Sequence, residues 1–490
     1  MAALFSVRDI LHITGGSLQG GSQDAEISSV TSDSRQVAQG DLFVAIKGER
    51  VDGHSFVPVA FSKGATAALV SHVTPDMTAA QQQVAQARGA GDTGHQRHSG
   101  PAIIITADPV LAMGALARWY REKFEIRVVG ITGSVGKTTT KDMVASVLNT
   151  RFRTLRNRGN LNTEVGVPLT LFQLRREHEV AVIEMAMRGP GQIKYLASLA
   201  QPVVGVLTNI GETHLETLGS VENVARTKAE LLDVLPPGGL AVLNRDSPWV
   251  VRMGDKYRGD KVWYSVHQPA DYVATDIESL ADRGMEFTLV TPRGIARVRE
   301  GLPGYHNVSN ALAAAAVAIG FFGLTPDDVK TGLDTMESSG SRSEVLEIAG
   351  FKLINDTYNS SPASSRAALA VLKDLASRGR TIAVLGDMLE LGTYSRLGHV
   401  EVGENVAKQG IDVLITMGEL ARHLAGAAKA HGVKAVFETS DHTEAARVLL
   451  EIVRPGDTVL VKGSRGMQME EVVWAVRSHF GAGGERHDTH

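Results

Sequence analysis

The chain has 490 residues, 43% of them hydrophobic and 21% charged, a composition typical of a globular protein with several buried cores. Lysine and arginine total 50 against 54 aspartates and glutamates, and this balance gives no electrostatic footprint for a polyanion such as DNA. The absence of cysteine excludes disulfides, thiolate metal sites and cysteine nucleophiles, and it fits a reducing cytoplasm.

The N-terminal stretch MAALFSVRDILHITGG lacks the basic start and long apolar core of a signal peptide, so none is predicted. Residues 74–101 are rich in Ala, Gln, Gly and His and have no sustained periodicity. Most of this segment is predicted to be a flexible insertion near the end of a first domain. The alternative is a short Ala/Gln helix followed by a loop, and neither version indicates chemistry.

From Ile126 onward, short apolar runs alternate with amphipathic segments, the pattern of a parallel sheet covered by helices. A helix is expected at 137–148, and strands are expected at 126–132, 180–184, 203–209 and 240–244. A second series begins near Leu353, with further strands at 381–385, 413–416 and 458–461. Between the two series, LPGYHNVSNALAAAAVAIGFFGL predicts a buried helix, because its apolar run is shorter than the about 20 residues of a membrane span.

These patterns predict an α/β protein of three domains. The boundaries are placed near residues 107 and 338, which gives segments 1–107, 108–337 and 338–490. We expect a cytoplasmic monomer with no membrane span and no nucleic-acid partner.

The stretch GITGSVGKTTTKDM, Gly130 to Met143, places glycines and Gly-Lys-Thr between the first predicted strand and its helix. Glycines let backbone N–H groups approach phosphate oxygens, and the helix N-terminus adds partial positive charge. Lys137 is expected to reach the terminal phosphates, and the Thr138 hydroxyl is expected to bind Mg²⁺. The strict pattern G-x-x-x-x-G-K-[ST] is not met, because Ile131 stands at its first glycine. The alternative is a helix-entry turn with an accidental lysine.

This glycine spacing resembles that of the Mur ligase superfamily, and further stretches carry the resemblance over nearly the whole chain. They are DSRQVAQGDLFVAIKGERVDGH, GNLNTEVGVPLTLF, TNIGETHLETLGS, NDTYNSSP, GDMLELG and VKGSRG. The resemblance is to members that join D-alanyl-D-alanine to UDP-N-acetylmuramoyl-tripeptide through an acyl phosphate made from ATP, in peptidoglycan synthesis. It implies a UDP-sugar-binding N-terminal domain, a central P-loop ATPase sheet and a Rossmann-like C-terminal domain that binds the amine and closes over ATP.

The resemblance also implies a site for two Mg²⁺ ions, held by Thr138, Glu184, His214 and Lys228, and a catalytic role for Lys137 with the last three of these. Lys228 stands out from the residues alone, because it follows Val221, Val224 and Ala225 on the apolar face of a predicted helix. Burial there favours a neutral amine, which can react with CO₂, and the family carries a carbamylated lysine at this position. The alternative is a snorkelling lysine whose amine reaches water. For Glu184 and His214 the alternatives are an exposed strand-end glutamate and a structural histidine.

The nucleotide contacts that the resemblance implies come from three parts of the chain. They are Gly133, Ser134, Val135, Gly136, Lys137, Thr138 and Thr139 in the glycine loop, His306, Asn307 and Asn310 near the base, and Arg342 and Asp356. Helix capping is the alternative for the His306 segment, and an exposed turn residue is the alternative for Asp356.

Substrate contacts follow from the same resemblance. Ser34 and Arg35 are candidates for the uridine nucleotide, and Asn160, Asn162 and Thr163 for the sugar-peptide. Tyr358, Asn359, Lys462 and Arg465 are candidates for the amine side, where an arginine could hold the dipeptide carboxylate. The alternative is that Lys462 and Arg465 are ordinary charged residues on the surface, without a binding role. Val135 departs from the family's usual Asn, and Ser360–Ser361 replace Ala-Asn, which could alter the amine pocket.

Three other functions compete with this interpretation. One is a related amide ligase with a different amine, although the Asp-Asn-Pro-Arg motif of the diaminopimelate-adding relative is absent from the sequence. Another is an NTPase switch that binds protein partners, which has no need of a uridine-binding domain. The third is a cell-wall scaffold without catalysis, which the presence of Lys137, Glu184, His214 and Lys228 argues against.

Overall fold

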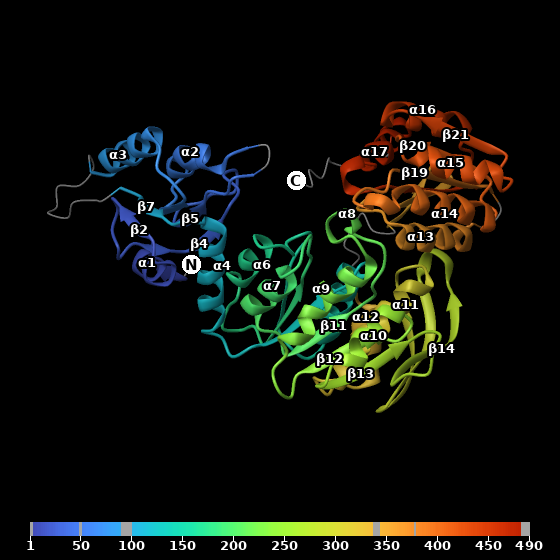
Figure 1. Cartoon of the computed structure of the whole chain (residues 1–490), viewed down its shortest axis with the longest axis horizontal. Helices are drawn as coiled ribbons and strands as arrows, with labels where there is room; N and C mark the ends of the chain where they lie inside the picture. The colour runs from blue at the N-terminus through green and yellow to red at the C-terminus, as the bar shows by residue number, and fades with distance from the viewer. Residues whose placement is uncertain (1–2, 49–50, 90–99, 337–343, 377–378, 482–490) are drawn as a thin grey trace. The chain divides into compact units, whose positions relative to one another are not determined.

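The computed structural model describes residues 3–48, 51–89, 100–336, 344–376 and 379–481 (Figure 1). The contacts divide the chain into two units. The first unit comprises Met1–Gly130, Arg153–Ala186 and Lys194–Pro202, and the second comprises Ile131–Phe152, Met187–Ile193 and Val203–His490. The fold is a mixed α/β architecture, as predicted.

The first unit contains a five-stranded sheet in the order β2-β7-β6-β5-β4. Its strands are β2 (Ser17–Gln19), β4 (Ser29–Thr31), β5 (Asp41–Val44), β6 (Ala67–Val70) and β7 (Ala102–Ile105). Neighbouring strands from β4 to β7 are parallel, and only β2 runs antiparallel. The helices are α1 (Val7–Thr14), η1 (Gly53–Phe56), α2 (Val57–Ser62), α3 (Pro75–Gly89) and α4 (Pro109–Arg121), and β1 (Phe5–Ser6) pairs with β3 (Glu26–Ile27).

Helix α3 corrects the prediction of a flexible insertion over most of residues 74–101. Pro75–Gly89 form a helix, which was the alternative interpretation, while residues 90–99 lie outside the described part. Met77 is fully buried against the core that contains Phe43 and Phe61. The Gln81 amide donates hydrogen bonds to the carbonyls of Gln19 and Pro101. Two buried side chains therefore anchor a helix whose apolar periodicity is too weak to recognise.

The rest of the first unit follows strand β8 (Arg127–Thr132), which begins in this unit. Its elements are β9 (Thr154–Arg156), α6 (Gly166–Leu171), β10 (Val180–Glu184) and most of α7 (Gln192–Ala200). Strands β9 and β10 are parallel. Helix α4 packs on both α1 and α6, and the ring of Phe5 contacts those of Tyr120 and Phe172.

The second unit opens with α5 (Lys137–Leu148) and continues with a row of six strands in the order β11-β12-β13-β14-β15-β16. The strands are β11 (Val204–Leu207), β12 (Leu240–Asn244), β13 (Asp260–Ser265), β14 (Tyr272–Ser279), β15 (Met285–Thr291) and β16 (Gly294–Glu300). The helical segments are α8 (Leu215–Leu218), α9 (Val221–Asp233), α10 (Pro248–Lys256), η2 (Ala281–Arg283), α11 (Tyr305–Gly320) and α12 (Pro326–Asp334). The predicted buried helix is α11, which packs on α5.

Two features of this row differ from the parallel pattern expected. Strand β11 ends at Leu207 rather than at Asn209, because Thr208 and Asn209 leave the strand to bond the glycine loop. Strands β14, β15 and β16 form an antiparallel meander that the sequence analysis did not foresee. Alternate residues of β15 are buried, as expected for a strand with one covered face.

The second unit also contains a six-stranded sheet in the order β17-β18-β22-β19-β20-β21. Its strands are β17 (Glu344–Ile348), β18 (Phe351–Asn355), β19 (Thr381–Gly386), β20 (Val413–Met417), β21 (Ala435–Thr439) and β22 (Thr458–Lys462), and all but β17 run parallel to their neighbours. Its helical segments are α13 (Pro362–Leu375), η3 (Gly392–Tyr394), α14 (Ser395–Lys408), α15 (Ala421–Ala430), α16 (His442–Ile452), η4 (Arg465–Met467) and α17 (Glu470–His479).

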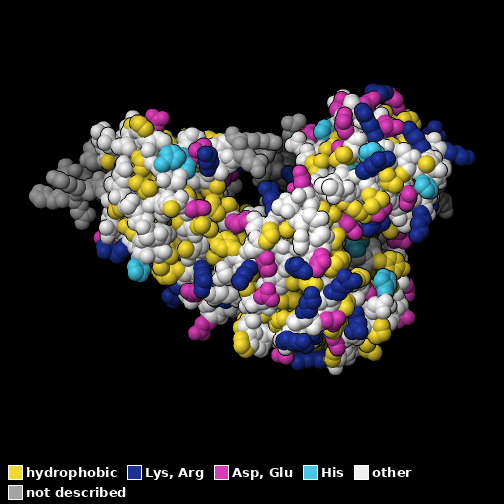
Figure 2. Space-filling view, in the orientation of Figure 1, with side chains coloured by type: hydrophobic (Ala, Val, Ile, Leu, Met, Phe, Trp, Pro, Cys, Tyr) yellow, Lys and Arg dark blue, Asp and Glu magenta, His cyan; other side chains and the backbone are white. Residues whose placement is uncertain are grey.

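Helices cover both faces of this sheet. One apolar cluster joins it to α16 and α17, and the other joins it to α13, α14 and α15. This arrangement agrees with the predicted Rossmann-like segment, whose ligands bind at the carboxyl ends of the strands. On the face shown in Figure 2, acidic and basic side chains are interspersed. Within the described ranges, every helix falls short of the length and apolarity needed to cross a bilayer.

Candidate functional site

The glycine loop enters α5 in the way that a phosphate site requires. Gly136 has a φ of 84° and stands directly before Lys137, the first residue of the helix. A Cβ at Gly136 would lie 2.5 Å from Asn310 Oδ1, so only glycine fits this approach to α11. The Lys137 amine folds over the loop and donates to the carbonyls of Gly133, at 2.9 Å, and Ser134, at 3.2 Å. An accidental lysine in a simple turn does not account for this arrangement.

The residues after β11 hold the loop in place. Asn209 Oδ1 accepts a hydrogen bond from Val135 N at 2.8 Å, and the Thr208 hydroxyl donates to the Val135 carbonyl at 2.7 Å. Ser134 Oγ accepts from Gly211 N at 3.0 Å and lies 3.0 Å from Thr213 Oγ1. These four supporting residues were not predicted from the sequence, although their position after a strand that ends at the sheet edge is a signal that could have found them.

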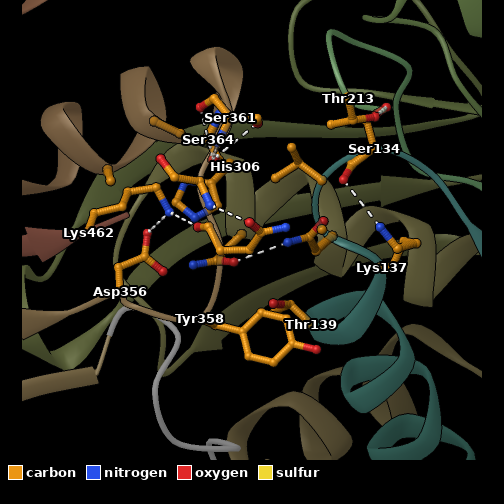
Figure 3. A pocket seen from close by; sticks show the side chains of 18 of the residues that line it. Ser134, Lys137, Thr139, Thr213, His306, Asp356, Tyr358, Ser361, Ser364 and Lys462 are labelled. Atoms are coloured by element: carbon orange, nitrogen blue, oxygen red, sulfur yellow. Dashed lines mark hydrogen bonds and ion pairs between the residues drawn. The ribbon is translucent and has the colours of Figure 1, made fainter. Parts of the chain in front are cut away.

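The loop, the start of α11 and the carboxyl edge of the six-stranded sheet line one pocket. Figure 3 shows Ser134 and Lys137 on one side and Asp356 and Lys462 on the other, with His306 and Tyr358 between. Of the predicted residues, the lining includes Ser134, Val135, Gly136, Lys137, Thr139, His306, Asn307, Asn310, Asp356, Tyr358, Asn359 and Lys462. The other two loop residues, Gly133 and Thr138, adjoin this lining in the chain, and Thr138 is buried. Arg342 lies outside the described residues.

Lys462 and Asp356 form an ion pair in the wall of this pocket. Lys462 Nζ lies 2.6 Å from Asp356 Oδ2 and donates to the Asn359 carbonyl at 2.8 Å. The lysine is only 2% exposed, so the surface-charge alternative is wrong for Lys462. Arg465 is exposed and pairs with Glu470 at 2.9 Å, which leaves that alternative open for Arg465.

The α11 residues of the pocket are tied to one another and to α5. Asn307 donates to the Pro303 carbonyl, Asn310 donates to Asn307 Oδ1, and Thr140 of α5 donates to Asn310 Oδ1. The N-cap of α11 is Gly304, without a side-chain capping bond, so the helix-capping alternative is wrong. Burial lowers the pKa of His306 and favours its neutral imidazole.

The two serines that depart from the family pattern have structural partners. Ser361 is the N-cap of α13 and forms a capping box with Ser364. Ser360 is buried, and its hydroxyl lies 2.8 Å from that of Ser365. Both serines line the pocket, and Ser361 also fixes the start of α13.

Lys228 is buried as its helical position predicts. It is 1% exposed on α9, on the same face as Val224 and Leu231, and its amine donates to the Gly133 carbonyl at 2.8 Å. A snorkelling lysine is therefore excluded. The amine lies against the backbone of the glycine loop.

His214 precedes the single turn of α8 and has a φ of 54°, in the left-handed region. Its Nδ1 atom lies 2.7 Å from Oε2 of Glu390, which belongs to the loop after β19. Hydrogen bonding to His214 holds the pKa of Glu390 below its usual value, and burial opposes this effect. Glu390 is the glutamate of the GDMLELG stretch, and no role was predicted for it from the sequence.

Glu184 lies in the first unit at the end of β10 and is 1% exposed, so the exposed strand-end alternative is wrong. Asn162 donates to its carboxylate at 2.7 Å. Asn157 exchanges hydrogen bonds with the Glu184 backbone and was missed by the sequence analysis. Asn160 and Thr163, predicted beside Asn162, are exposed.

Ser34 and Arg35 also lie in the first unit, in the loop after β4. Arg35 is exposed and forms an ion pair with Asp33 at 2.9 Å. Lys63 donates to the carbonyls of both Ser34 and Arg35. The Lys63 amine therefore holds this loop through hydrogen bonds to its backbone carbonyls.

These donors fit the groups that the resemblance implies. A glycine cradle at a helix N-terminus with a lysine amine suits a triphosphate, and a carboxylate beside the pocket suits ribose hydroxyls. Thr138 and His214 in the second unit and Glu184 in the first offer the hydroxyl, imidazole and carboxylate chemistry that divalent cations accept. The native Lys228 amine fits a cation only if it is converted to an anion.

A second group of potential metal ligands, Asp52, His54 and His72, lies in the first unit. His54 Nδ1 lies 2.6 Å from Asp52 Oδ1, and its Nε2 accepts a hydrogen bond from Ser71 N at 2.9 Å. Because Nε2 accepts, the proton is on Nδ1 and both ring nitrogens of His54 are engaged. This group therefore holds two loops together.

Comparisons with known proteins agree with these features. Three family models match: the Mur ligase family, catalytic domain, over residues 26–94, the Mur ligase middle domain over 131–318, and the Mur ligase, glutamate ligase domain over 341–465. The UDP-N-acetylmuramoyl-tripeptide–D-alanyl-D-alanine ligase of Bacillus subtilis is 35% identical, over 96% of this chain and 97% of the relative.

Two solved structures are also similar. The MurF structure from Acinetobacter baumannii has a TM-score of 0.84 at 31% identity and covers 97% of this chain and 99% of its own. The structure of MurF ligase from Thermotoga maritima in complex with ADP has a TM-score of 0.77 at 28% identity, over 93% and 98% of the two chains.

Proposed function

The chain belongs to the Mur ligase family, in the group of UDP-N-acetylmuramoyl-tripeptide–D-alanyl-D-alanine ligases, and from this premise we propose how its residues carry out the reaction. The protein is an ATP-dependent, ADP-forming ligase that produces the UDP-N-acetylmuramoyl-pentapeptide precursor of peptidoglycan. The proposed mechanism rests on the pocket formed by the glycine loop, α11 and the edge of the six-stranded sheet.

The reaction has two steps. The terminal phosphate of ATP passes to the C-terminal carboxylate of the tripeptide, so an acyl phosphate forms and ADP leaves. The amine of D-alanyl-D-alanine then attacks the carbonyl carbon, an amide bond forms, inorganic phosphate leaves, and the nitrogen loses a proton. Phosphoryl transfer needs positioning and charge neutralisation more than covalent help from the protein.

The residues of the pocket are suited to these needs. We assign the loop N–H groups and Lys137 to the phosphates, since both lie at the N-terminus of α5. We assign Asp356 to the ribose, with Lys462 as the buried residue that positions it, and His306, Asn307 and Asn310 to the base side. This assignment moves Lys462 from the amine to the nucleotide. Arg342, in the segment before β17, remains a proposed phosphate contact.

We assign Thr138, Glu184, His214 and Lys228 to two Mg²⁺ ions, which when bound neutralise the phosphate charge during transfer. Glu184 is prepared for this role by burial and by the amide of Asn162. Lys228 contributes as a carbamate, in which Nζ bonds to CO₂ and loses a proton. The Nζ–H that remains in a carbamate still donates to the Gly133 carbonyl, so the observed contact is compatible with the modification.

Lys228→Ala tests the carbamate. The variant is expected to lose activity and to regain part of it with added short-chain carboxylates, which can occupy the space of the missing anion. Isotope-labelled bicarbonate should give a carbamate carbon signal in the wild-type protein only. A folded variant without rescue, together with no carbamate signal, would overturn the carbamate and leave Lys228 as a support of the loop.

For the substrates, we keep Ser34 and Arg35 as contacts of the uridine nucleotide and Asn160, Asn162 and Thr163 as contacts of the sugar-peptide. Asn160 and Thr163 are exposed and therefore accessible to it. Tyr358, Asn359 and Arg465 are proposed on the amine side, with Arg465 available for the dipeptide carboxylate.

The proposal extends to the organisation of the protein. We place domain boundaries near residues 107 and 338, and the three matched family segments each fall within one of the resulting parts. The second boundary lies outside the described residues. We also propose a cytoplasmic monomer, in keeping with a nucleotide-linked substrate and a chain without cysteine.

The deciding experiment measures phosphate release with ATP, Mg²⁺ and UDP-N-acetylmuramoyl-tripeptide, with and without D-alanyl-D-alanine. Release should depend on the dipeptide and give a pentapeptide product by mass, and Lys137→Ala should abolish it. Phosphate release that does not depend on the dipeptide would contradict the assignment of D-alanyl-D-alanine as the amine substrate. A screen of other amines would then identify the one that the Ser360–Ser361 wall accepts.

A further inference from the structure

The loop after β19 contacts the short helix α8. The Glu390 carbonyl accepts a hydrogen bond from Glu216 N at 3.2 Å. A Cβ at Gly392 would lie 2.9 Å from the Glu216 Cα atom, so the two backbones approach as closely as glycine allows. The loop of the six-stranded sheet is therefore fixed beside the residue that precedes α8, His214.

The Glu390 carboxylate faces the imidazole of His214. The separation of 2.7 Å between Oε2 and Nδ1 is that of a hydrogen bond. An ionised carboxylate can only accept, so Nδ1 carries the proton. In the neutral imidazole the lone pair is then on Nε2, the atom that remains for a cation.

Both partners have unfavourable backbone conformations for residues with a side chain. His214 has a φ of 54° and Glu390 a φ of 62°. Left-handed conformations in non-glycine residues cost on the order of 1 kcal/mol and persist where the surroundings impose them. Two such residues that meet through their side chains indicate a contact maintained for function.

The histidine loop is also held from the other side. Thr213, next to His214, lies within hydrogen-bond distance of Ser134 in the glycine loop. Residues 211–214 are therefore fixed between the phosphate cradle and the loop of the six-stranded sheet. Arg188 adds a further favourable charge near Glu390.

We propose that Glu390 is a positioning residue for His214: it fixes the imidazole tautomer and ring orientation so that Nε2 can bind the divalent cation. Carboxylates that accept from the other nitrogen of a ligating histidine strengthen metal binding in this way. Because Glu390 belongs to the loop after β19 of the six-stranded sheet, the histidine is fully oriented only when that loop is seated against α8. The inference rests on the proposed role of His214 as a metal ligand.

The test uses Mn²⁺ as a paramagnetic probe and measures its binding to the full chain with ADP by electron paramagnetic resonance. Glu390→Ala should weaken Mn²⁺ binding about 10-fold or more. Glu390→Gln should lose less, because its amide oxygen still accepts from Nδ1–H. Glu216→Gln is the matched control: it removes a carboxylate from α8 that does not contact His214, and it should bind Mn²⁺ as the wild type does.

A double-mutant cycle separates this role from a structural one. In a His214→Ala background, Glu390→Ala should cause no further loss of Mn²⁺ binding. Wild-type binding by Glu390→Ala, or an equal loss with and without His214, would overturn the inference and leave the metal role of His214 intact. Wild-type binding by His214→Ala would overturn that role and the inference with it. Urea unfolding of each variant confirms that it is folded.

Discussion

Glu300 ends β16 with a fully buried side chain, and its Oε1 atom has no hydrogen-bond partner among the residues that the structure describes. Burial raises its pKa to about 8, although Leu302 N donates to the other oxygen. The ordinary value is 4.5, so the unfolded chain releases this proton at a lower pH than the folded chain does. The ionisation of Glu300 therefore leaves the free energy of unfolding independent of pH below about pH 4.5. Above that, it lowers the free energy of unfolding as the pH rises toward about 8.

Glu300→Gln should remove this pH dependence. Between pH 5 and 8, the wild type should lose on the order of 1.4 kcal/mol per pH unit relative to the variant. Urea unfolding at several pH values measures the difference. Glu347→Gln, at an exposed position of β17, is the control and should follow the wild type. Parallel stability curves for wild type and Glu300→Gln would contradict the prediction.

The Asp356–Lys462 pair predicts a second effect on stability. Asp356→Ala leaves a buried ammonium with the Asn359 carbonyl as its remaining partner among the contacts described above, so unfolding should become easier by about 3 kcal/mol. Adding Lys462→Met should recover part of this loss, because it removes the uncompensated charge. Asp282→Ala breaks the more exposed pair with Lys352 and should cost less than about 1 kcal/mol. Equal losses from the two aspartate variants in urea unfolding would contradict the difference in burial.

At the residue scale, the sequence predicted what a local pattern determines. The burial of Lys228 followed from helical periodicity, because Val224 and Leu231 lie on the same face. The burial of Lys462 could not be predicted, since it depends on β22 lying in the middle of a sheet. The contact of His214 with Glu390 joins residues far apart in the chain and leaves no local signal either.

At the scale of elements, α14 and α15 pack closely through glycine. A Cβ at Gly403 of α14 would lie 2.3 Å from the Leu424 carbonyl oxygen of α15. Gly426 of α15 is exposed, and a Cβ there would meet no atom within 4 Å. The same substitution should therefore have opposite effects on two facing helices.

Gly403→Ala should lower the free energy of unfolding by about 2 kcal/mol, because the helices must separate to admit the methyl group. Gly426→Ala should raise it by about 0.5 to 1 kcal/mol, because alanine favours the helix at an open site. Thermal or urea unfolding of the two variants measures both signs. A loss of stability in both variants would contradict the prediction that Gly426 of α15 is an open site.

The boundaries of elements were predictable where the signals are local. Helix α5 begins and ends at the predicted residues, because a glycine loop fixes its start. Helix α3 was predicted only as the alternative, because Met77 and Gln81 are the two buried residues among its described side chains. The strand after residue 203 was predicted too long, because the side chains of Thr208 and Asn209 bond the glycine loop at the point where the strand ends.

At the scale of the molecule, the pocket predicts a shared response to nucleotide. Residues 134–137, 356 and 358–361 line it from different parts of the chain. ADP with Mg²⁺ should therefore slow hydrogen exchange in peptides covering both segments, measured by mass spectrometry. Peptides from α16 contribute nothing to the pocket lining and serve as the control. Protection confined to the glycine loop would contradict the assignment of Asp356 to the nucleotide.

The alternation of strands and helices was sufficient to predict the α/β class and a second parallel, helix-covered sheet near the C-terminus, whereas its Rossmann-like character was expected from the family resemblance. It could not reveal that the first unit draws on residues 153–186 and 194–202 in addition to the N-terminal part. That arrangement depends on contacts between distant segments, such as those of α4 with both α1 and α6. The antiparallel meander of β14 to β16 was not predicted from the sequence, because it continues a row that begins with parallel strands.

The position of β22 bears on how the protein is made. Among the described strands, the pair β17–β18 and the trio β19–β20–β21 join in one sheet only through β22, which follows the other five in the chain and is therefore synthesised after them. The same strand brings Lys462 to Asp356. A polypeptide cut short before Thr458 therefore lacks both the middle of this sheet and the buried cation of the nucleotide pocket. Prematurely terminated products should be recognised as unfolded and degraded rather than persist as partly active competitors for ATP.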